Sequence, residues 1–321
     1  MNSRQPPATL SLDLDNQWAY MRVHGDPGWE TFPSYLDRVA PLILGQLAAR
    51  GLRITFFLVG QDAALDRNRE ALARIAAAGH EVGNHSFEHR PSLARQAPAA
   101  IEEELARAEE AIEAVTGQRP RGFRGPGFCC SSALLGVLAR RGYSYDASAF
   151  PTLIGPLARA YYLLRTPTRS AGQEERAGLF GSWRQGIGPL RPFFWQVEGG
   201  KLLEIPVTTM PFLRTPVHLT YLLYMAGHST RLALAYFRAA VRLCRATQTP
   251  LSLLLHPLDF LGREDVPELA YFPGMTLCGE RKRELVARVL ELLCAAFAPL
   301  PLGEFARAHA GPAAGLPARR F

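Results

Sequence analysis

Long apolar runs are missing from this sequence. The most apolar stretch, residues 219–227 (LTYLLYMAG), is followed directly by His228, Ser229 and Arg231. A helix that crosses a bilayer needs about 20 apolar residues, so we predict no membrane span. The N-terminus (MNSRQPPATL) has no basic segment followed by an apolar one, and we expect no secretory signal. The expectation is a cytoplasmic protein, with association at a membrane surface as the alternative.

Cysteine and nucleotide-binding motifs are also scarce. The five cysteines are an odd number without framework spacing, which indicates reduced thiols in a cytoplasmic protein. The adjacent pair Cys129 and Cys130 does not have the spacing of a zinc knuckle. No Gly-x-Gly-x-x-Gly motif follows the first apolar segment, which argues against a dinucleotide-binding domain. Only the net charge favours nucleic acid, and we predict no nucleic-acid partner.

Acidic residues are sparse in one part of the chain. The net charge is +7. Residues 151–248 contain 12 basic and 4 acidic residues, whereas residues 1–150 contain 16 and 17, and residues 249–321 contain 8 of each. A basic region of this kind favours a phosphate, an anionic glycan or an anionic lipid surface. A solvated arginine-rich face is the alternative interpretation.

What the sequence does have is a regular alternation of strand and helix patterns. The expected strands are residues 9–14, 54–59, 80–83, 122–124, 143–147, 202–208 and 251–255, and the expected helices are residues 35–50, 69–78, 98–116, 131–140, 230–247 and 281–297. Residues 16–29 are expected to form a loop. Residues 151–200 show little periodicity and are interpreted as an insertion or lid. The alternation predicts a parallel sheet or a closed β/α barrel in a single domain.

Two acidic residues end the first expected strand. Asp13 and Asp15 are two positions apart, so on an extended strand both carboxylates point the same way. β/α folds place their active sites at the carboxyl ends of the strands. Acids at strand ends are also common on ordinary surfaces, which is the alternative for this pair.

Histidines follow two further strands. His85 and His89 are four apart, which predicts that both imidazoles lie on one side of a helical turn and reach one cation. Two imidazoles and one carboxylate suit Zn²⁺, Co²⁺, Ni²⁺ or Fe²⁺. His256 directly follows the apolar strand 251–255 and is either a core histidine or a general acid that faces the same pocket.

In this order the motifs resemble those of the polysaccharide deacetylase (NodB-homology) family, carbohydrate esterase family 4. The matching segments are residues 11–16 (SLDLDN), 85–89 (HSFEH), 123–128 (FRGPGF) and 253–256 (LLLH), and residues 145–148 (YDAS) come nearest to a fourth motif. Two departures concern the substrate and the oxyanion site. Leu14 separates acids that are adjacent in most members, and Gly127 stands where a tyrosine is often found.

The resemblance implies a distorted (β/α)7 TIM-like barrel and a metal-dependent hydrolase. The reaction would remove an N-acyl group, acetyl or formyl, from an amino sugar or glycan, and the substrate could be anionic or lipid-linked. The implied metal ligands are Asp15, His85 and His89, with Zn²⁺ favoured over Co²⁺, Ni²⁺ or Fe²⁺. The implied catalytic residues are Asp13 as base, His256 as acid and Arg124 as the partner of Asp13, with Gly127, Phe128 and Asp146 at the oxyanion or substrate.

Several alternatives stay open at this point. The same fold could hydrolyse a small cyclic amide or imide, or be a catalytically inactive carbohydrate-binding relative, although the full set of acids and histidines argues against the latter. Aromatic residues in the central region could stack on sugars or belong to the core: Tyr161, Tyr162, Trp183, Phe193, Phe194 and Trp195. Residues 219–236 are amphipathic and could contact a membrane peripherally.

Overall fold

The computed structural model describes residues 5–154, 186–198, 200–309 and 315–321. One sheet forms its centre, with the strand order β10-β6-β7-β5-β4-β3-β2-β1-β8 and β9 paired to β1. All described strand pairs are parallel except β6–β7, which is antiparallel. The strands are β1 (Pro7–Asp13), β2 (Thr55–Leu58), β3 (Glu81–Asn84), β4 (Gly122–Phe123), β5 (Tyr145–Asp146), β6 (Phe193–Val197), β7 (Gly200–Glu204), β8 (Leu251–Leu255), β9 (Ala298–Leu300) and β10 (Ala318–Arg320).

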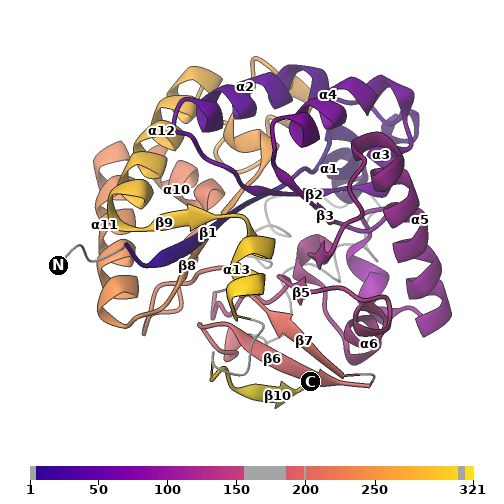
Figure 1. The fold of residues 1–321 in the computed structure, drawn as a ribbon. Helices are drawn as coiled ribbons and strands as arrows, with labels where there is room; N and C mark the ends of the chain where they lie inside the picture. Colours follow the sequence, from indigo (N-terminus) through magenta and orange to yellow (C-terminus); the bar gives the residue numbers. More distant parts are fainter. Residues whose placement is uncertain (1–4, 155–185, 199, 310–314) are drawn as a thin grey trace.

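Helices surround the strands on the outside (Figure 1). They are α1 (Gln17–His24), α2 (Leu36–Ala48), α3 (Gly60–Ala63), α4 (Asp66–Ala77), α5 (Pro98–Thr116), α6 (Ser132–Arg140), α10 (Leu219–Ala226), α11 (Thr230–Ala246), α12 (Gly279–Ala296) and α13 (Leu302–His309). Among the described residues, no helix is both long enough and apolar enough to cross a membrane. The predicted α/β class with a mostly parallel sheet is confirmed.

The sheet is not closed into a complete barrel. Its two sides approach each other beyond β7, where the N–H of Thr208 donates to the carbonyl of Ser252 in β8 at 3.1 Å. The N–H of Ser252 donates in turn to Oγ1 of Thr208 at 2.6 Å. Because Thr208 lies outside the assigned strands, these contacts bring the edges together without continuous pairing. The distorted barrel is therefore open at this point.

The central strand β1 carries both core and polar side chains. Leu10 and Leu12 are fully buried in the main hydrophobic cluster, and Ser11 and Asp13 alternate with them. Successive side chains of a strand point to opposite faces, so one face of β1 supplies the core and the other supplies polar groups. The parallel pairing with β8 brings Leu12 opposite Leu255 and the strand ends side by side. This arrangement positions the candidate site.

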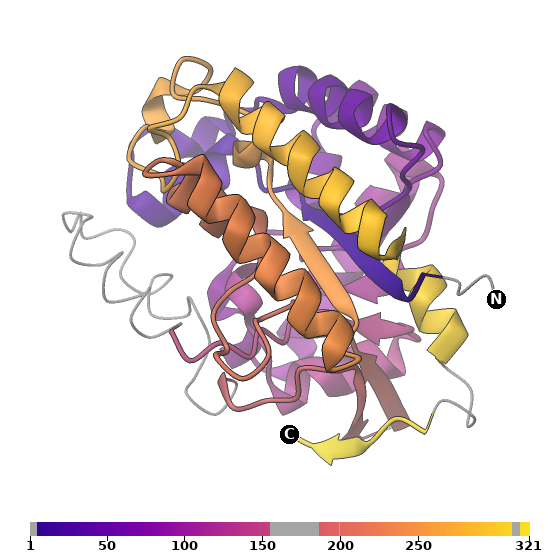
Figure 2. The same cartoon turned by 90° about the vertical axis from the view of Figure 1, so that its left-hand side faces the viewer.

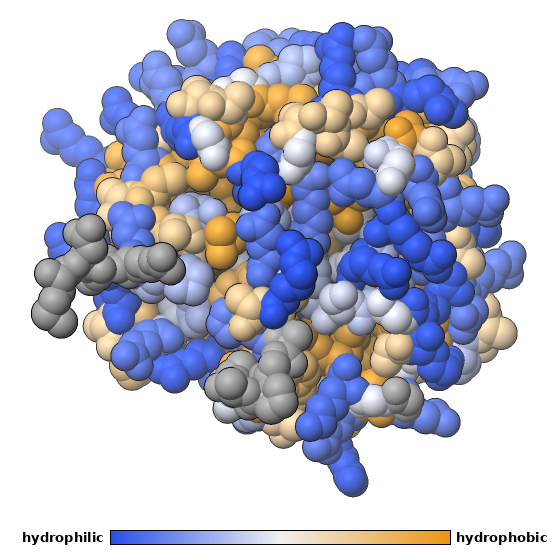
Figure 3. Space-filling model, in the orientation of Figure 1, coloured by the Kyte–Doolittle hydropathy of each residue, from blue (hydrophilic) through white to orange (hydrophobic). Residues whose placement is uncertain are grey.

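The opposite end of the sheet is covered by α13. The N–H of Leu302 donates to Oγ1 of Thr55 at 2.8 Å, and the N–H of Gly303 donates to the carboxylate of Glu81 at 2.8 Å. Both acceptors lie at the starts of β2 and β3, so α13 satisfies polar groups at the amino ends of the strands. Figure 3 shows the same side of the molecule as Figure 1, with hydrophilic side chains around its edge and across its centre, and apolar ones between them.

Some predicted segments differ from the structure. The expected loop at 16–29 contains α1, which begins at Asn16, whose side chain accepts from the N–H of Gln17, and ends at Gly25 in a left-handed conformation with φ 85°. The expected insertion at 151–200 contains β6, which pairs with β7. The segment 219–236 is divided between α10 and α11. Helix α5 has the predicted bounds, since its buried positions recur at three- and four-residue spacing up to Gly117.

Candidate active site

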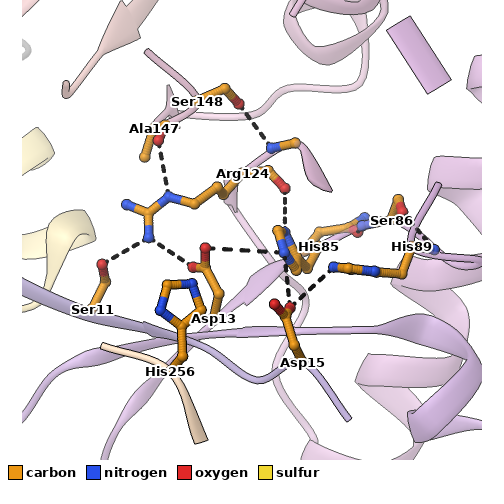
Figure 4. A network of polar contacts seen from close by, with 12 residues as sticks. Ser11, Asp13, Asp15, His85, Ser86, His89, Arg124, Ala147, Ser148 and His256 are labelled. Atoms are coloured by element: carbon orange, nitrogen blue, oxygen red, sulfur yellow. Dashed lines mark hydrogen bonds and ion pairs between the residues drawn. The ribbon is translucent and has the colours of Figure 1, made fainter. Parts of the chain in front are cut away.

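The carboxylate of Asp13 is held at the end of β1 by Arg124, which follows β4. Nη1 of Arg124 donates to Oδ1 of Asp13 at 2.7 Å and to Oγ of Ser11 at 2.9 Å (Figure 4). Nε of Arg124 donates to the carbonyl of Ala147 at 2.9 Å, and its guanidinium lies 4.5 Å from the ring centre of Phe57. A buried, charge-assisted hydrogen bond has little freedom, so Arg124 fixes the direction of Asp13.

The segment after β3 brings His85 and His89 together, but the predicted helical turn is wrong. Ser86 and His89 have positive φ angles of 64° and 55°, so the chain curls back on itself. Oγ of Ser86 accepts from the N–H of His89 at 3.1 Å, and Arg22 of α1 donates to the carbonyls of Glu88 and His89 at 2.8 and 2.7 Å. The two imidazole centres lie 4.8 Å apart in this loop.

Side-chain atoms of Asp15, His85 and His89 converge on one point. One ligand atom from each lies within 4.8 Å of the others, and all three residues are buried. Oδ1 of Asp15 is 3.3 Å from Nε2 of His85 and 3.0 Å from Nε2 of His89. Oδ1 of Asp15 and Nε2 of His89 have no hydrogen-bond partner among the described residues. Ligands about 2.0–2.2 Å from a tetrahedral cation lie about 3.4 Å apart, so these atoms fit a divalent metal.

The tautomer of His85 and the lowered pKa of His89 support the same interpretation, whereas Asp13 and Asp15 raise the pKa of His85 against the effect of burial. Nδ1 of His85 lies 2.6 Å from the carbonyl oxygen of Arg124, and a carbonyl only accepts, so Nδ1 carries the proton and Nε2 is free to bind a cation. Burial lowers the pKa of His89 below its usual value against the opposing effect of Asp15, which favours the neutral imidazole. Burial raises the pKa of Asp15, but His89 and His85 together lower it well below its usual range.

A tight turn follows β4 at the predicted oxyanion segment. The N–H of Phe128 donates to the carbonyl of Gly125 at 2.9 Å, so it is already used within the turn. The predicted oxyanion role therefore rests on the N–H of Gly127, which has φ 60°. The N–H of Gly125 donates to Oγ of Ser148 at 2.8 Å. A Cβ at Gly125 would overlap the carbonyl oxygen of Cys129, so this close approach requires glycine.

Asp146 supports this turn from beneath. It is 1% exposed, and its Oδ1 accepts from Oγ of Ser148 at 2.6 Å. Burial raises the pKa of Asp146, and burial together with Asp146 raises the pKa of Glu204 well above its usual value. The raised pKa favours the protonated form of Glu204 beside Asp146. These contacts favour a supporting role for Asp146 over the predicted contact with substrate or oxyanion.

His256 lies beside Asp13, on the opposite side from His89 (Figure 4). Its backbone N–H donates to Oδ2 of Asp259 at 2.8 Å. Oγ1 of Thr220 donates to Oδ1 of Asp259 at 2.9 Å and lies 3.3 Å from Nδ1 of His256. Thr220 therefore contacts the imidazole of His256, and Asp259 fixes both Thr220 and the backbone of His256.

Sequence reasoning missed Thr220, Asp259 and His218. Asp259 had a local signal, because an acid three residues after His256, with proline between, is typical of a helix cap. His218 and Thr220 lie at the start of α10, far from His256 in sequence, and no local pattern links them. The ring centre of His218 is 5.8 Å from that of His256. Burial, His256 and Arg124 lower the pKa of His218 well below its usual value, so this imidazole is neutral.

Asn16, the residue after the second acid, has a structural role. Its Nδ2 donates to Oδ1 of Asp62 at 2.7 Å, and its Oδ1 accepts from the N–H of Tyr35 at 3.2 Å. Trp18 also donates to Oδ1 of Asp62, at 2.9 Å. Burial raises the pKa of Asp62 to about 7. Asn16 thus connects the end of β1 to the starts of α1 and α2 through hydrogen bonds.

The predicted sugar-stacking residues are only partly described. Tyr161, Tyr162 and Trp183 lie outside the described residues. Phe193 is fully buried and packs at 4.6 Å from the ring centre of Trp195. Nε1 of Trp195 donates to Glu204 at 2.7 Å, so these two rings belong to the packing around the sheet edge.

Comparison with known proteins agrees with this geometry. Residues 26–145 match the model of the polysaccharide deacetylase family. Over this segment, somewhat more than a third of the chain, the sequence resembles the polysaccharide deacetylase family. A crystal structure of a candidate polysaccharide deacetylase from Mycobacterium smegmatis shares the fold, with a TM-score of 0.65 and 20% sequence identity over 100% of this chain and 94% of that chain.

Curated members of the family match shorter segments. A chitooligosaccharide deacetylase from Bradyrhizobium is 34% identical over 103 residues, which are 32% of this chain and 46% of that protein. A peptidoglycan-N-acetylglucosamine deacetylase from Bacillus cereus is 33% identical over 86 residues, 27% of this chain and 30% of that protein. The matched segments thus span less than half of these relatives.

Proposed function

We propose that this chain removes an N-acyl group, acetyl in the first place, from an amino sugar or glycan by metal-assisted hydrolysis. One observation carries the proposal. Three buried ligand atoms from Asp15, His85 and His89 converge beside Asp13, a separate carboxylate that Arg124 orients. A divalent cation bound there, Zn²⁺ first among the candidates, would polarise the acyl carbonyl and lower the pKa of a water molecule.

The residues around this point have complementary tasks. Asp13 accepts a proton from the attacking water, and Arg124 keeps its carboxylate directed into the site. His256 gives a proton to the departing nitrogen, with its ring held by Thr220. The N–H of Gly127 donates to the oxygen that gains negative charge. Overall, water is added across the C–N bond, and a carboxylic acid and a free amine leave.

The names of the relatives support the choice of first substrates. They are deacetylases of chitooligosaccharides and of N-acetylglucosamine in peptidoglycan. The glycan class and the acetyl group are thus both proposed from these relatives. A formyl group is the alternative acyl group for the same chemistry.

The test is an assay of acetate and formate release from chitooligosaccharides, peptidoglycan fragments and N-formyl amino sugars. The chain is first stripped with a chelator and then given Zn²⁺, Co²⁺, Ni²⁺ or Fe²⁺ separately. We expect acetate release that depends on added metal and is lost in Asp13→Asn, while Asp66→Asn, an exposed acid on α4, keeps it. Equal release with and without metal, or hydrolysis of cyclic imides alone, contradicts the proposal.

A further inference from the structure

The loop between β7 and α10 ends in two exposed apolar side chains. Phe212 is 79% exposed and Leu213 is 63% exposed. The loop is a tight hairpin, because the N–H of Met210 donates to the carbonyl of Thr215 and the N–H of Arg214 donates to the carbonyl of Met210, both at 2.8 Å. The two apolar side chains are therefore presented at the apex of an ordered structure.

Further exposed apolar side chains lie next to this apex. Nη1 of Arg214 donates to the carbonyls of Gly186 and Gly188, each at 2.8 Å, and these glycines flank Ile187, which is 67% exposed. The carbonyl of Arg214 accepts from the N–H of Leu153, which is 39% exposed. We name this cluster the apolar tip; it consists of Leu153, Ile187, Phe212 and Leu213.

The backbone of the apex is unusual for its residue. Phe212 has φ 69°, a left-handed conformation that glycine or asparagine adopts at lower cost. Most of the surface of Phe212 is in solvent, so this residue adds little to the packing of the folded chain. A bulky apolar residue in a strained, exposed position is explained by a contact outside the chain.

A stripe of arginines runs beside the apolar tip along α11. The hydroxyl of Tyr236 in α11 donates to Oγ1 of Thr215 at 2.7 Å and to the carbonyl of Pro216 at 2.8 Å, which joins the helix to the hairpin. Figure 2 shows α11 in the foreground on the outside of the molecule. The arginine stripe consists of Arg231, Arg238, Arg242 and Arg245, all exposed.

The spacing of these arginines places them on one face of the helix. Steps of seven, four and three residues keep side chains on the same side, and the opposite side of α11 is buried in the core. Helix α11 contains no acidic residue, and the stripe makes no ion pair with any described residue. Its positive charge is therefore available to a negatively charged partner.

We propose that the apolar tip and the arginine stripe together form a docking surface for an anionic lipid bilayer. The apolar tip enters the region between headgroups and acyl chains, and the arginines pair with lipid phosphates. A nucleic acid would use the same positive charge but offers no apolar environment for Leu213 and Ile187. Binding to a bilayer is a further property of the chain, and the proposed hydrolysis does not depend on it.

The docking surface borders the candidate site. The hairpin starts beside Thr208, which contacts Ser252 in β8, the strand that ends before His256. His218 begins α10 directly after the hairpin, and its ring faces that of His256. Docking therefore brings the His256 side of the candidate site close to the plane of the bilayer, where a substrate attached to a lipid would be presented.

The test is sedimentation of the full chain with vesicles of phosphatidylglycerol and phosphatidylcholine, compared with phosphatidylcholine alone. We expect binding to the anionic vesicles that weakens as salt rises to about 0.5 M. Arg238→Gln together with Arg242→Gln should weaken binding about 25-fold, roughly five-fold for each arginine. Phe212→Ser together with Leu213→Ser should weaken it about ten-fold or more at every salt concentration.

Matched controls separate the docking surface from total charge and apolarity. Arg69→Gln with Arg74→Gln removes the same charge from α4, and Phe321→Ser removes an exposed ring from the C-terminal end. Both should bind as the unchanged chain does, and all variants should melt at its temperature. Equal loss in the α4 variant, or preference for duplex RNA over vesicles with no effect of the apolar substitutions, overturns the proposal.

Discussion

Nδ1 of His85 lies 2.6 Å from the carbonyl oxygen of Arg124, while the guanidinium of the same arginine donates to Asp13 at 2.7 Å. One fully buried residue thus sets both the tautomer of a metal-ligand candidate and the direction of the candidate base. This double contact explains why the segment after β4 belongs to the site although it supplies no metal ligand. It also separates the role of Asp13, the candidate base, from that of Asp15, the metal-ligand candidate.

Asp13→Asn should leave the metal in place and remove most of the activity. The amide keeps an oxygen to accept from Arg124 but cannot take a proton from water, so kcat should fall by about 10²–10⁴. Initial rates of acetate release and elemental analysis of the same sample check this. Wild-type turnover in the variant would exclude Asp13 as the base.

His85→Ala and His89→Ala should each lower the metal content of the purified chain. Removing one of three protein ligands leaves too few for tight binding. Elemental analysis after equilibration with limiting Zn²⁺ measures the effect, with His24→Ala, a histidine outside the cluster, as the control. Full occupancy in both ligand variants would rule out this metal site.

Thr220→Val should impair the positioning of His256. The valine cannot donate to Asp259 or contact Nδ1 of the imidazole, and loss of about one hydrogen bond predicts a fall in kcat of roughly five- to ten-fold with little change in KM. The limb of the kcat–pH profile that reports the general acid should shift as well. A variant with lower stability but an unchanged pH profile would show that Thr220 only supports the fold; Thr230→Val is the exposed control.

Asp62 should make stability fall as pH rises. Its pKa is raised to about 7 in the folded chain, whereas an unfolded aspartate titrates near 3.9, so the folded state binds more protons between these values. The free energy of unfolding is therefore greatest at the low-pH end of this window and falls as the pH rises through 7. Asp62 alone should lower it by about 3 kcal/mol between pH 5 and pH 8. Asp62→Asn should remove that part of the pH dependence in thermal melts. An unchanged slope would contradict the raised pKa.

Much of the architecture was predictable from periodicity. Helix α5 and strand β8 have the predicted bounds because each combines a clear apolar pattern with a defined end. Helix α1 was not predicted, since its short sequence mixes polar and aromatic residues and its cap, Asn16, depends on contacts with Asp62 and Tyr35. The strands β9 and β10 have three residues each, and pairing with a distant strand decides their conformation. Strand β6 lies in a part of the sequence with little periodicity and was not predicted either.

The site was predictable where an acid or a histidine stands at the end of an expected strand. Asp13, Asp15, His85 and His256 were identified because each lies at the end of a recognisable strand. Arg124 was identified only through the resemblance to the family motif, and the structure brings it against Asp13. The curled conformation of the His85–His89 segment could not be derived from spacing, since the contacts of Arg22 shape it. The neighbours of His256 at the start of α10 were missed because tertiary packing alone connects them.

The pairing of β1 with β8 also determines when the molecule can mature during synthesis. Ala8 pairs with Leu251, and these partners are 243 residues apart in the chain (251 minus 8). Until the ribosome has delivered β8, one edge of β1 is open over much of its length, with Leu10 and Leu12 uncovered beside it. Parallel strands joined over such a distance assemble slowly. The nascent N-terminal segment is therefore the portion most in need of chaperone protection against premature association.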